Sequence, residues 1–375
     1  MFWPTRTGVL LVAVFAALSF GPSAGGLAAQ NALKFDTPEL THSVADPLLA
    51  PLARWDAVWY LRVADSGYGE SEARAAFFPL YPLAVRGLAT PFGASPAALL
   101  IAAYAAALAA FLAALTLLHR LVALELGRPL ARLVLLLLAV FPAALYFGAP
   151  YAESLFLLLS VGAFYAARTG RWAWAGAAAG AAAATRNSGA LLIVPLLLIW
   201  WSSSRPDLRD AAWLLLAPLG LAAYALFLGL AEGDALRFVH AHEAWHRELS
   251  WPLAGAWEGF QAALDAPGDP YRVAALNLIL FGSLAFAVVA CVGVFRRLPL
   301  PYGAWVAVSL ALPLSEPVEP QPLMSLPRFL AVLFPIFMWL ALWSEERDAT
   351  DRVAAVSALG LGLFTSWFAS WHWLA

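Results

Sequence analysis

The residue types best suited to proton-transfer chemistry lie in residues 54–81, a charged and aromatic stretch between two apolar segments. Its composition is typical of a folded loop at a membrane surface, with rings at headgroup level and charges in water. If residues 56–65 form a short helix, Asp56, Trp59 and Tyr60 share one face at 100° per residue. A carboxylate among aromatic rings is suited to act as a general base. The alternative, which spacing alone slightly favours, is that Asp56 caps the helix by accepting backbone N–H bonds.

Two further polar positions interrupt apolar runs. Glu153 enters an apolar run shortly after Pro150, and Arg186 and Asn187 belong to the polar break TRNSG. A helix dipole favours an acid in the first turn, which would explain Glu153 without any function. An arginine at a membrane boundary can snorkel its charge to water. The alternative is that Arg186 holds a phosphate.

Arg328 opens a late apolar run behind a proline-rich segment, residues 315–327. Positive charge is disfavoured at the extracytoplasmic end of a span, so a ligand anion explains this arginine as well as snorkelling does. Arg247 falls on the same side of the membrane in the topology described below. Arg186, Arg247 and Arg328 are therefore our candidate cations for a phosphate, with Asn187 beside them.

A rival motif is HEAWH, residues 242–246, which fits H-E-x-x-H. The spacing places His242 and His246 one turn apart for zinc, with Glu243 as base, and would indicate a membrane zinc protease. Acids that could act as a third ligand, none in a recognisable motif, are Asp265, Asp269, Glu316 and Glu319. The alternative is an amphipathic interfacial helix with Trp245 towards lipid or protein. We favour that alternative and predict no metal site and no cofactor.

The elements that must position these residues follow from composition. Of 375 residues, 62% are hydrophobic and 12% charged, against about 25% charged in soluble domains. Backbone groups in lipid must be satisfied internally, and the long Ala/Leu-rich runs favour helices over a barrel. We expect an all-α, polytopic integral membrane protein forming one domain over residues 1–375. The single cysteine, Cys291, excludes an intramolecular disulfide, and a net charge of −2 gives no indication of nucleic-acid binding.

We predict eleven spans and expect Pro142, Pro195, Pro218 and Pro335 to kink their helices. The first run could pass for a signal peptide, but the ten that follow favour an uncleaved span. The predicted spans are Val9–Ala29, Ala97–Leu118, Leu133–Phe147, Ala152–Ala167, Trp172–Ala184, Ala190–Trp201, Ala211–Leu230, Val273–Val294, Tyr302–Leu314, Phe329–Trp343 and Val353–Trp373.

Charge in the short loops predicts the orientation. With a cytoplasmic N-terminus, twelve of the 22 basic residues, Arg6 included, fall in short segments on one side, which satisfies the positive-inside rule. The opposite side has two long loops, residues 30–96 and 231–272, the first and fourth of its loops, each with an interfacial helix. A polar site would therefore face the extracytoplasmic side.

With these segments in view, the chain resembles the PIG-V family, the GPI mannosyltransferase II group and its bacterial relatives. These are membrane glycosyltransferases of the GT-C class. The resemblance rests on five stretches in family order: RWDAVWYLRVADSGY with AFFPLYPL, APYAESLFLLLS, TRNSG, Ala241–Pro252, and LPRFLAVLFPIF. TRNSG departs from the expected R-S-N-G-like order, and His242 stands where relatives more often have an amide side chain.

The resemblance implies a GT-C-like architecture, a polyprenyl- or dolichyl-phosphate sugar donor, most often mannose, and the acid of the first large loop, Asp56, as base. It also implies a membrane-associated glycan or lipid acceptor and a bacterial cell membrane as the location. Residues expected to support the site are Trp55, Tyr60, Glu153, His242, Trp245 and His246.

Chemistry agrees with this expectation. A sugar on a lipid phosphate has a good leaving group, so one carboxylate suffices to take the proton of the attacking hydroxyl, with inversion at the anomeric carbon. The departing phosphate needs cations in a low-dielectric site. A transporter of lipid or small solute is the main non-enzyme alternative. Its ionisable residues would lie near the bilayer midplane, whereas here the charges fall at span ends and in loops.

Overall fold

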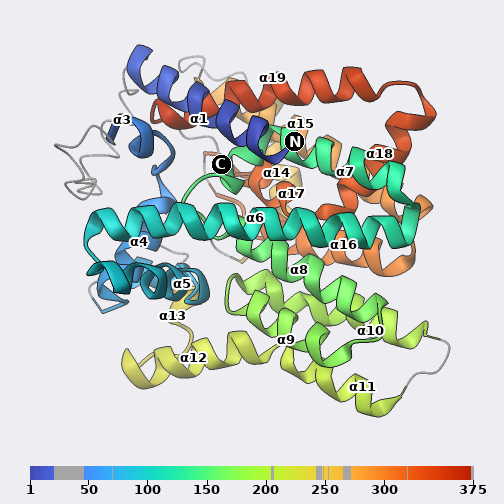
Figure 1. Cartoon of the computed structure of the whole chain (residues 1–375), viewed down its shortest axis with the longest axis horizontal. Helices are drawn as coiled ribbons and strands as arrows, with labels where there is room; N and C mark the ends of the chain where they lie inside the picture. The colour runs from blue at the N-terminus through green and yellow to red at the C-terminus, as the bar shows by residue number, and fades with distance from the viewer. Residues whose placement is uncertain are drawn as a thin grey trace.

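The computed structural model describes residues 1–20, 46–69, 71–203, 207–241, 247, 249–251, 253–264, 272–318 and 320–372. Within these ranges the chain forms helices and no strand, which confirms the all-α prediction. Figure 1 shows α6 (Pro96–Leu126) running through the middle of the molecule. Helices α1 (Phe2–Ser19) and α19 (Thr350–Ala369) lie along one side of α6, and α12 (Leu219–Ala231) lies on the other.

The central helix α6 has clear start and stop signals. Ser95 caps it by accepting the Ala98 N–H at 3.3 Å, and Pro96 occupies its first position, where a missing N–H costs nothing. Gly127, with φ of 89°, ends it and lets α7 (Arg128–Val140) turn back. Small side chains on the buried face of α6 allow α8 (Glu153–Arg168) to approach closely.

The described parts of the predicted spans fall on helices or runs of short helices, and the first span, Val9–Ala29, is described only as far as Phe20. Five described helical segments are long and apolar enough to cross a membrane: Phe2–Ser19, Pro96–Leu126, Leu208–Ala231, Ala275–Arg297 and Thr350–Ala369. Shorter apolar helices, Asn187–Trp201 and Leu300–Leu314, lie among them. Eleven crossings therefore remain a prediction.

The four prolines stand where one helical element gives way to the next, and whether they kink a continuous span stays a prediction. Pro142 begins the 3₁₀ segment η4 (Pro142–Phe147) after α7 has ended at Val140. Pro218 immediately precedes α12. Pro195 and Pro335 stand in the first turns of α10 (Ile193–Trp201) and α18 (Phe334–Glu346). A proline in a first turn removes an N–H that has no intrahelical acceptor, so the chain starts a new helix there.

Glycines allow close backbone packing around the loop that follows α9 (Trp172–Ala183). A Cβ on Gly220 of α12 would lie 1.9 Å from the Gly180 carbonyl oxygen, and one on Gly189 would lie 2.2 Å from the Ala182 carbonyl carbon. The α12 backbone and the 3₁₀ segment η5 (Asn187–Leu192) can therefore lie directly against α9. This close packing fixes where the chain turns at Arg186.

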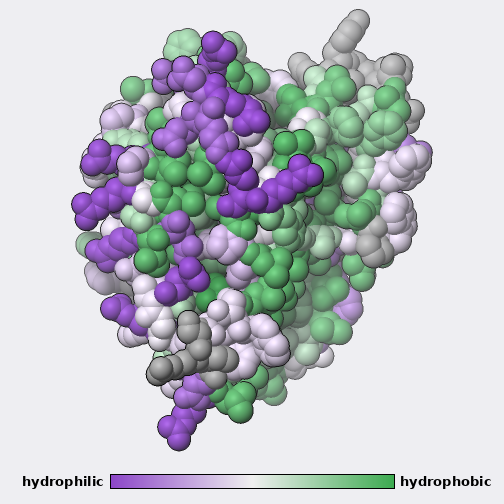
Figure 2. Space-filling view, turned by 90° about the vertical axis from the view of Figure 1, so that its right-hand side faces the viewer, coloured by the Kyte–Doolittle hydropathy of each residue, from purple (hydrophilic) through white to green (hydrophobic). Residues whose placement is uncertain are grey.

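The short arginine-rich connections gather at one end of the molecule. The turns from α6 to α7 and from α18 to α19 lie together at the right of Figure 1, and Figure 2 shows hydrophilic side chains spread over that end. Arg6 is an exception to the predicted charge distribution, because it is buried and donates to the carbonyls of Ala139, at 2.8 Å, and Ala144, at 2.5 Å. It satisfies acceptors left open where α7 ends and is not a loop cation.

Candidate active site

Asp56 is the first residue of α4 (Asp56–Ser66), and the first six residues of this helix are buried on all sides, so the predicted division into two faces is wrong for that part of it. Asp56, Trp59 and Tyr60 are buried, whereas Asp65 is exposed on the opposite face. No side chain caps the N-terminus of α4. The Asp56 carboxylate instead forms an ion pair with Arg328, so the capping interpretation is wrong.

The backbone just before Asp56 is held in an unusual conformation. Trp55 has φ of 55° and ψ of −120°, a region that costs a non-glycine residue about 1–3 kcal/mol. The Tyr151 hydroxyl brackets it, since it donates to the Arg54 carbonyl at 2.9 Å and accepts the Asp56 N–H at 3.1 Å. The Trp55 ring packs edge-on against Trp371, with ring centres 5.4 Å apart. The backbone of Trp55 thus positions Asp56, and the Trp55 side chain does not line the cavity described below.

Arg328 comes from the other end of the chain, on the short helix α17 (Leu326–Ala331). Ser325, directly before this helix, also has a positive φ, 71°. The Arg328 guanidinium lies 5.8 Å from the ring centres of both Tyr146 and Tyr151. Aromatic faces and the Asp56 carboxylate therefore surround its charge.

Glu153 joins two of the candidate cations. It begins α8 and is 1% exposed. One of its oxygens, Oε1, lies 2.7 Å from Nη1 of Arg186 and 3.4 Å from Nε of Arg328. The first-turn placement expected from the helix dipole is present, but the acid also orients two guanidinium groups.

Three arginines surround one aromatic ring. The guanidinium carbons of Arg186, Arg247 and Arg328 lie 5.1, 6.0 and 5.7 Å from the ring centre of Phe329. Burial first, then the charges of Arg328 and Arg186, lower the pKa of Arg247 to about 10, while Glu316 opposes this shift. Arg247 stays protonated at neutral pH, but its charge is poorly stabilised where it stands.

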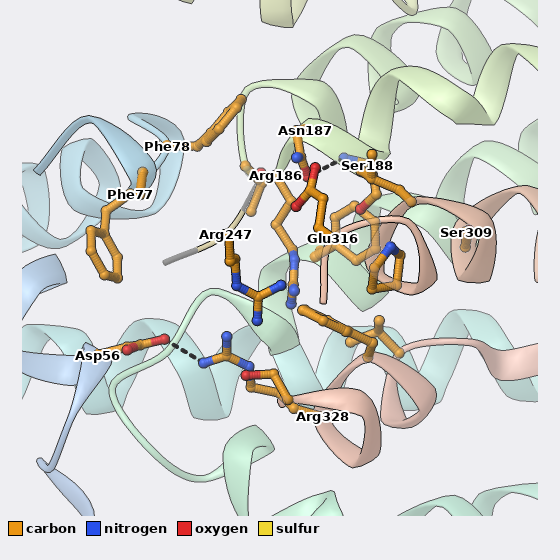
Figure 3. A pocket seen from close by; sticks show the side chains of 18 of the residues that line it. Asp56, Phe77, Phe78, Arg186, Asn187, Ser188, Arg247, Ser309, Glu316 and Arg328 are labelled. Carbon is orange, nitrogen blue, oxygen red and sulfur yellow. Dashed lines mark hydrogen bonds and ion pairs between the residues drawn. The ribbon is translucent and has the colours of Figure 1, made fainter. Parts of the chain in front are cut away.

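These side chains line a cavity of about 150 Å³ between the helices. Figure 3 shows Asp56 on one side of the cavity and the three arginines converging at its centre, with Asn187 and Glu316 on the side opposite Asp56. The Asn187 side-chain oxygen accepts the Ser188 N–H at 2.7 Å. Predicted site residues on the lining are Asp56, Tyr60, Arg186, Asn187, Arg247 and Arg328. Apolar side chains complete the cavity, among them Phe77, Phe78, Phe156 and Leu333.

The comparisons with known proteins bear on this arrangement. A model of the mannosyltransferase (PIG-V) family matches residues 5–219, more than half of the chain. The chain belongs to the PIG-V mannosyltransferase family. Among individually curated proteins, none matches it.

The fold of this PIG-V protein is similar to that of ArnT from Cupriavidus metallidurans, solved in a crystal bound to undecaprenyl phosphate. The TM-score is 0.51 at 14% identity, over 92% of this chain and 76% of that one. ArnT is a GT-C glycosyltransferase, so the GT-C-like architecture is confirmed. Family and fold together show an integral membrane glycosyltransferase.

Three predicted supporting residues, His242, Trp245 and His246, lie outside the described part of the PIG-V chain, as does Glu243. Among described residues, no group of three or more His, Cys, Asp or Glu side chains could hold a metal. Because the motif itself lies outside those residues, the zinc-protease alternative stays untested by the structure.

Sequence reasoning missed several residues of the site. Tyr151 and Tyr146 stand in or beside the APYAES stretch, which signalled an important segment but not their roles. Phe329 follows Arg328 directly. Glu316 was considered only as a zinc ligand, yet it lines the cavity with the arginines. Only the folded chain brings these side chains to one place.

Proposed function

We propose that this protein transfers a sugar, mannose in the first instance, from a polyprenyl-phosphate donor to a membrane-associated acceptor with inversion at the anomeric carbon. One observation carries the proposal: Asp56 and three arginines from distant parts of the chain line a single cavity between membrane helices. One carboxylate facing several cations is the arrangement that displacement of a phosphate by a hydroxyl requires.

In the proposed reaction the acceptor hydroxyl attacks the anomeric carbon while the bond from that carbon to the phosphate oxygen breaks. The electron pair of the broken bond goes to the phosphate, and Asp56 takes the hydroxyl proton. Arg186, Arg247 and Arg328 stabilise the phosphate as its charge grows. Asn187 supplies a side-chain amide beside these three arginines.

The ion pair between Asp56 and Arg328 gives the donor a further role in this scheme. A carboxylate oxygen that accepts a hydrogen bond from a guanidinium is not free to accept the proton of an attacking hydroxyl. A phosphate entering among the three arginines would compete for Arg328 and loosen its hold on Asp56. Asp56 would then become a competent base only when the donor is bound. Glu153, bonded to Arg186, would keep the guanidinium groups in place during this exchange.

The lipid nature of the donor is supported by two features. The lining of the cavity contains several apolar side chains beside its charges, so it suits a ligand with both a phosphate and a hydrocarbon part. The neighbour ArnT was solved with undecaprenyl phosphate bound. We further propose that the cavity faces the extracytoplasmic side, since the short arginine-rich loops gather at the other end of the molecule.

The decisive experiment compares Asp56→Asn with Asp65→Asn. Both changes remove one carboxylate from α4, but Asp65 is exposed and does not line the cavity. Asn keeps the size of the side chain and its hydrogen-bonding capacity but cannot accept the proton. Sugar transfer from mannosyl-phosphoryl-polyprenol, measured in membranes with equal protein, should fall about 10²–10⁴-fold for Asp56→Asn and stay unchanged for Asp65→Asn.

Other outcomes would separate the parts of the proposal. An active Asp56→Asn variant refutes the base. Activity with glucosyl- but not mannosyl-phosphoryl-polyprenol keeps the mechanism and refutes the sugar. Glu243→Gln should transfer sugar normally, and loss of a proteolytic activity in that variant would support the zinc protease instead. A reporter fused after Arg74 should lie outside the cytoplasm and one after Arg205 inside, and the reverse pattern would refute the orientation.

A further inference from the structure

A second hollow lies far from the candidate active site, between α15 (Arg272–Arg297) and α18. It is a groove of about 380 Å³ at the C-terminal ends of these two helices. The helix that follows, α16 (Leu300–Leu314), starts beside this groove and ends in the wall of the active-site cavity. Fifteen helical residues span about 22 Å, so the groove is separate from that cavity.

One end of the groove is apolar and faces outward. Val288, Val289 and Val292 line it, and these side chains are 55%, 58% and 46% exposed. They lie on a helix apolar enough to cross a membrane, so hydrocarbon chains of lipid are their natural neighbours. The apolar end can therefore accommodate an acyl chain.

The other end of the groove carries positive charge. Arg296, Arg297 and Arg347 line it together with the acid Glu346. Glu346 pairs with Arg297, which leaves the groove with an excess of two positive charges. The Arg347 guanidinium lies 4.9 Å from the ring centre of Trp343, which holds that charge at the groove wall. This end of the molecule is the hydrophilic one seen in Figure 2.

Tryptophans form the floor between the two ends. Trp339 and Trp343 both line the groove, with ring centres 6.3 Å apart. A Cβ on Gly293 would lie 2.0 Å from the Trp339 indole nitrogen, so only glycine lets this ring lie against the α15 backbone. Tryptophan favours the level of lipid headgroups. The groove thus passes from apolar through interfacial to cationic side chains, the same order as in a phospholipid read from acyl chain to phosphate.

We propose that this groove binds an anionic phospholipid, with the phosphodiester between Arg296 and Arg347 and an acyl chain along the valines of α15. Basic pockets between membrane helices are suited to anionic headgroups. A zwitterionic lipid would bring its own cation to the arginines and would bind less well. Because the groove is remote from the cavity, lipid binding does not depend on the donor, acceptor or reaction proposed above.

The test measures lipid retention by purified protein. Native mass spectrometry in detergent, with added phosphatidylglycerol or phosphatidylcholine, should show preferential binding of phosphatidylglycerol. The double variant Arg296→Gln/Arg347→Gln should weaken that binding about 10- to 30-fold, from the contribution of each arginine at an anionic surface. A matched control, Arg120→Gln/Arg209→Gln, removes two exposed arginines from the same end of the molecule but outside the groove, and should bind like the unchanged protein.

Several results would overturn the proposal. One is equal binding of phosphatidylglycerol and phosphatidylcholine by the unchanged protein. Another is an equal loss of binding in both double variants, which would indicate a general effect of net charge. Elution profiles and apparent unfolding temperatures should match among the three proteins. Since Gln keeps the side-chain stem and neither arginine is buried, a variant that binds normally also refutes the site.

Discussion

Tyr151→Phe removes a single oxygen atom and tests whether the backbone before Asp56 is held for a purpose. The lost hydroxyl bonds the Arg54 carbonyl and the Asp56 N–H. The Arg54 carbonyl keeps a second partner, the Ala57 N–H at 3.2 Å. The buried Asp56 N–H keeps no other bond that the described structure records. One unsatisfied buried donor costs about 1–3 kcal/mol, and the stability of the variant should fall by that amount.

The effect on activity should exceed the effect on stability. Without the Tyr151 bracket, the strained backbone at Trp55 can relax, and Asp56 at the start of α4 moves with it. A misplacement of roughly 1 Å can cost about 10²-fold in rate. We therefore expect kcat to fall between about 10- and 100-fold, with little change in the KM for the donor, because the arginines are untouched.

A matched variant, Tyr81→Phe, makes the result interpretable. Tyr81 is fully buried and donates to the Ala103 carbonyl at 3.0 Å, and it does not line the cavity. Its loss should cost about 0.5–1.5 kcal/mol and leave kcat unchanged. Unfolding in detergent is irreversible for many such proteins, so apparent inactivation temperatures are compared at one heating rate. Equal kcat values for the two variants would refute the idea that Tyr151 positions Asp56.

Two further predictions concern the framework of the site. Glu153→Gln leaves Arg186 without its buried carboxylate and should destabilise the protein by about 3–5 kcal/mol, seen as a lower inactivation temperature. The control, Glu346→Gln, breaks an ion pair whose side chains are 44% exposed and should cost at most about 1 kcal/mol. Equal effects of the two changes would show that Glu153 is not needed to orient the arginines. Gly220→Ala forces a methyl group against the Gly180 carbonyl and should lower the stability of the protein by about 1–3 kcal/mol. In the control, Gly282→Ala, the added methyl group meets nothing within 4 Å and should not lower the stability. Identical thermal stability of the two variants would refute the packing argument.

Much of the fold could be predicted from the sequence because its signals are local. Apolar runs show where helices lie. Ser95-Pro96 and Gly127 mark the ends of α6 by known capping chemistry. Proline showed where helices are interrupted, but not whether a span bends or a new helix starts. That choice depends on how neighbouring helices pack.

The sequence could predict several residues of the site but not the contacts between them. Asp56, Arg186 and Arg328 stood out because charges are rare in apolar surroundings. Asp56 and Arg328 are 272 residues apart, and no periodic pattern relates them. Tyr151 gave no signal of its own, since a buried tyrosine in an apolar chain is ordinary. The proposed role of Tyr151 depends on the positive φ of Trp55, which cannot be read from the sequence.

Strain and charge together explain why the site has this form. Trp55 and Ser325 both have positive φ, and each stands immediately before a helix that bears one member of the Asp56–Arg328 pair. Strain of this kind persists only where the surroundings fix it, and here Tyr151 and the ion pair itself connect the two turns. The cavity also balances its charges, with Arg186, Arg247 and Arg328 against Asp56, Glu153 and Glu316. A donor phosphodiester adds one negative charge to that balance, and a second develops on the phosphate as the sugar leaves. Of the acids, Asp56 is the one most easily displaced from its arginine, because Glu153 is fully buried and bonded to Arg186. The arrangement therefore favours release of Asp56 over release of Glu153 when a phosphate enters, which supports our proposal that Asp56 accepts the proton and that Glu153 positions the arginines.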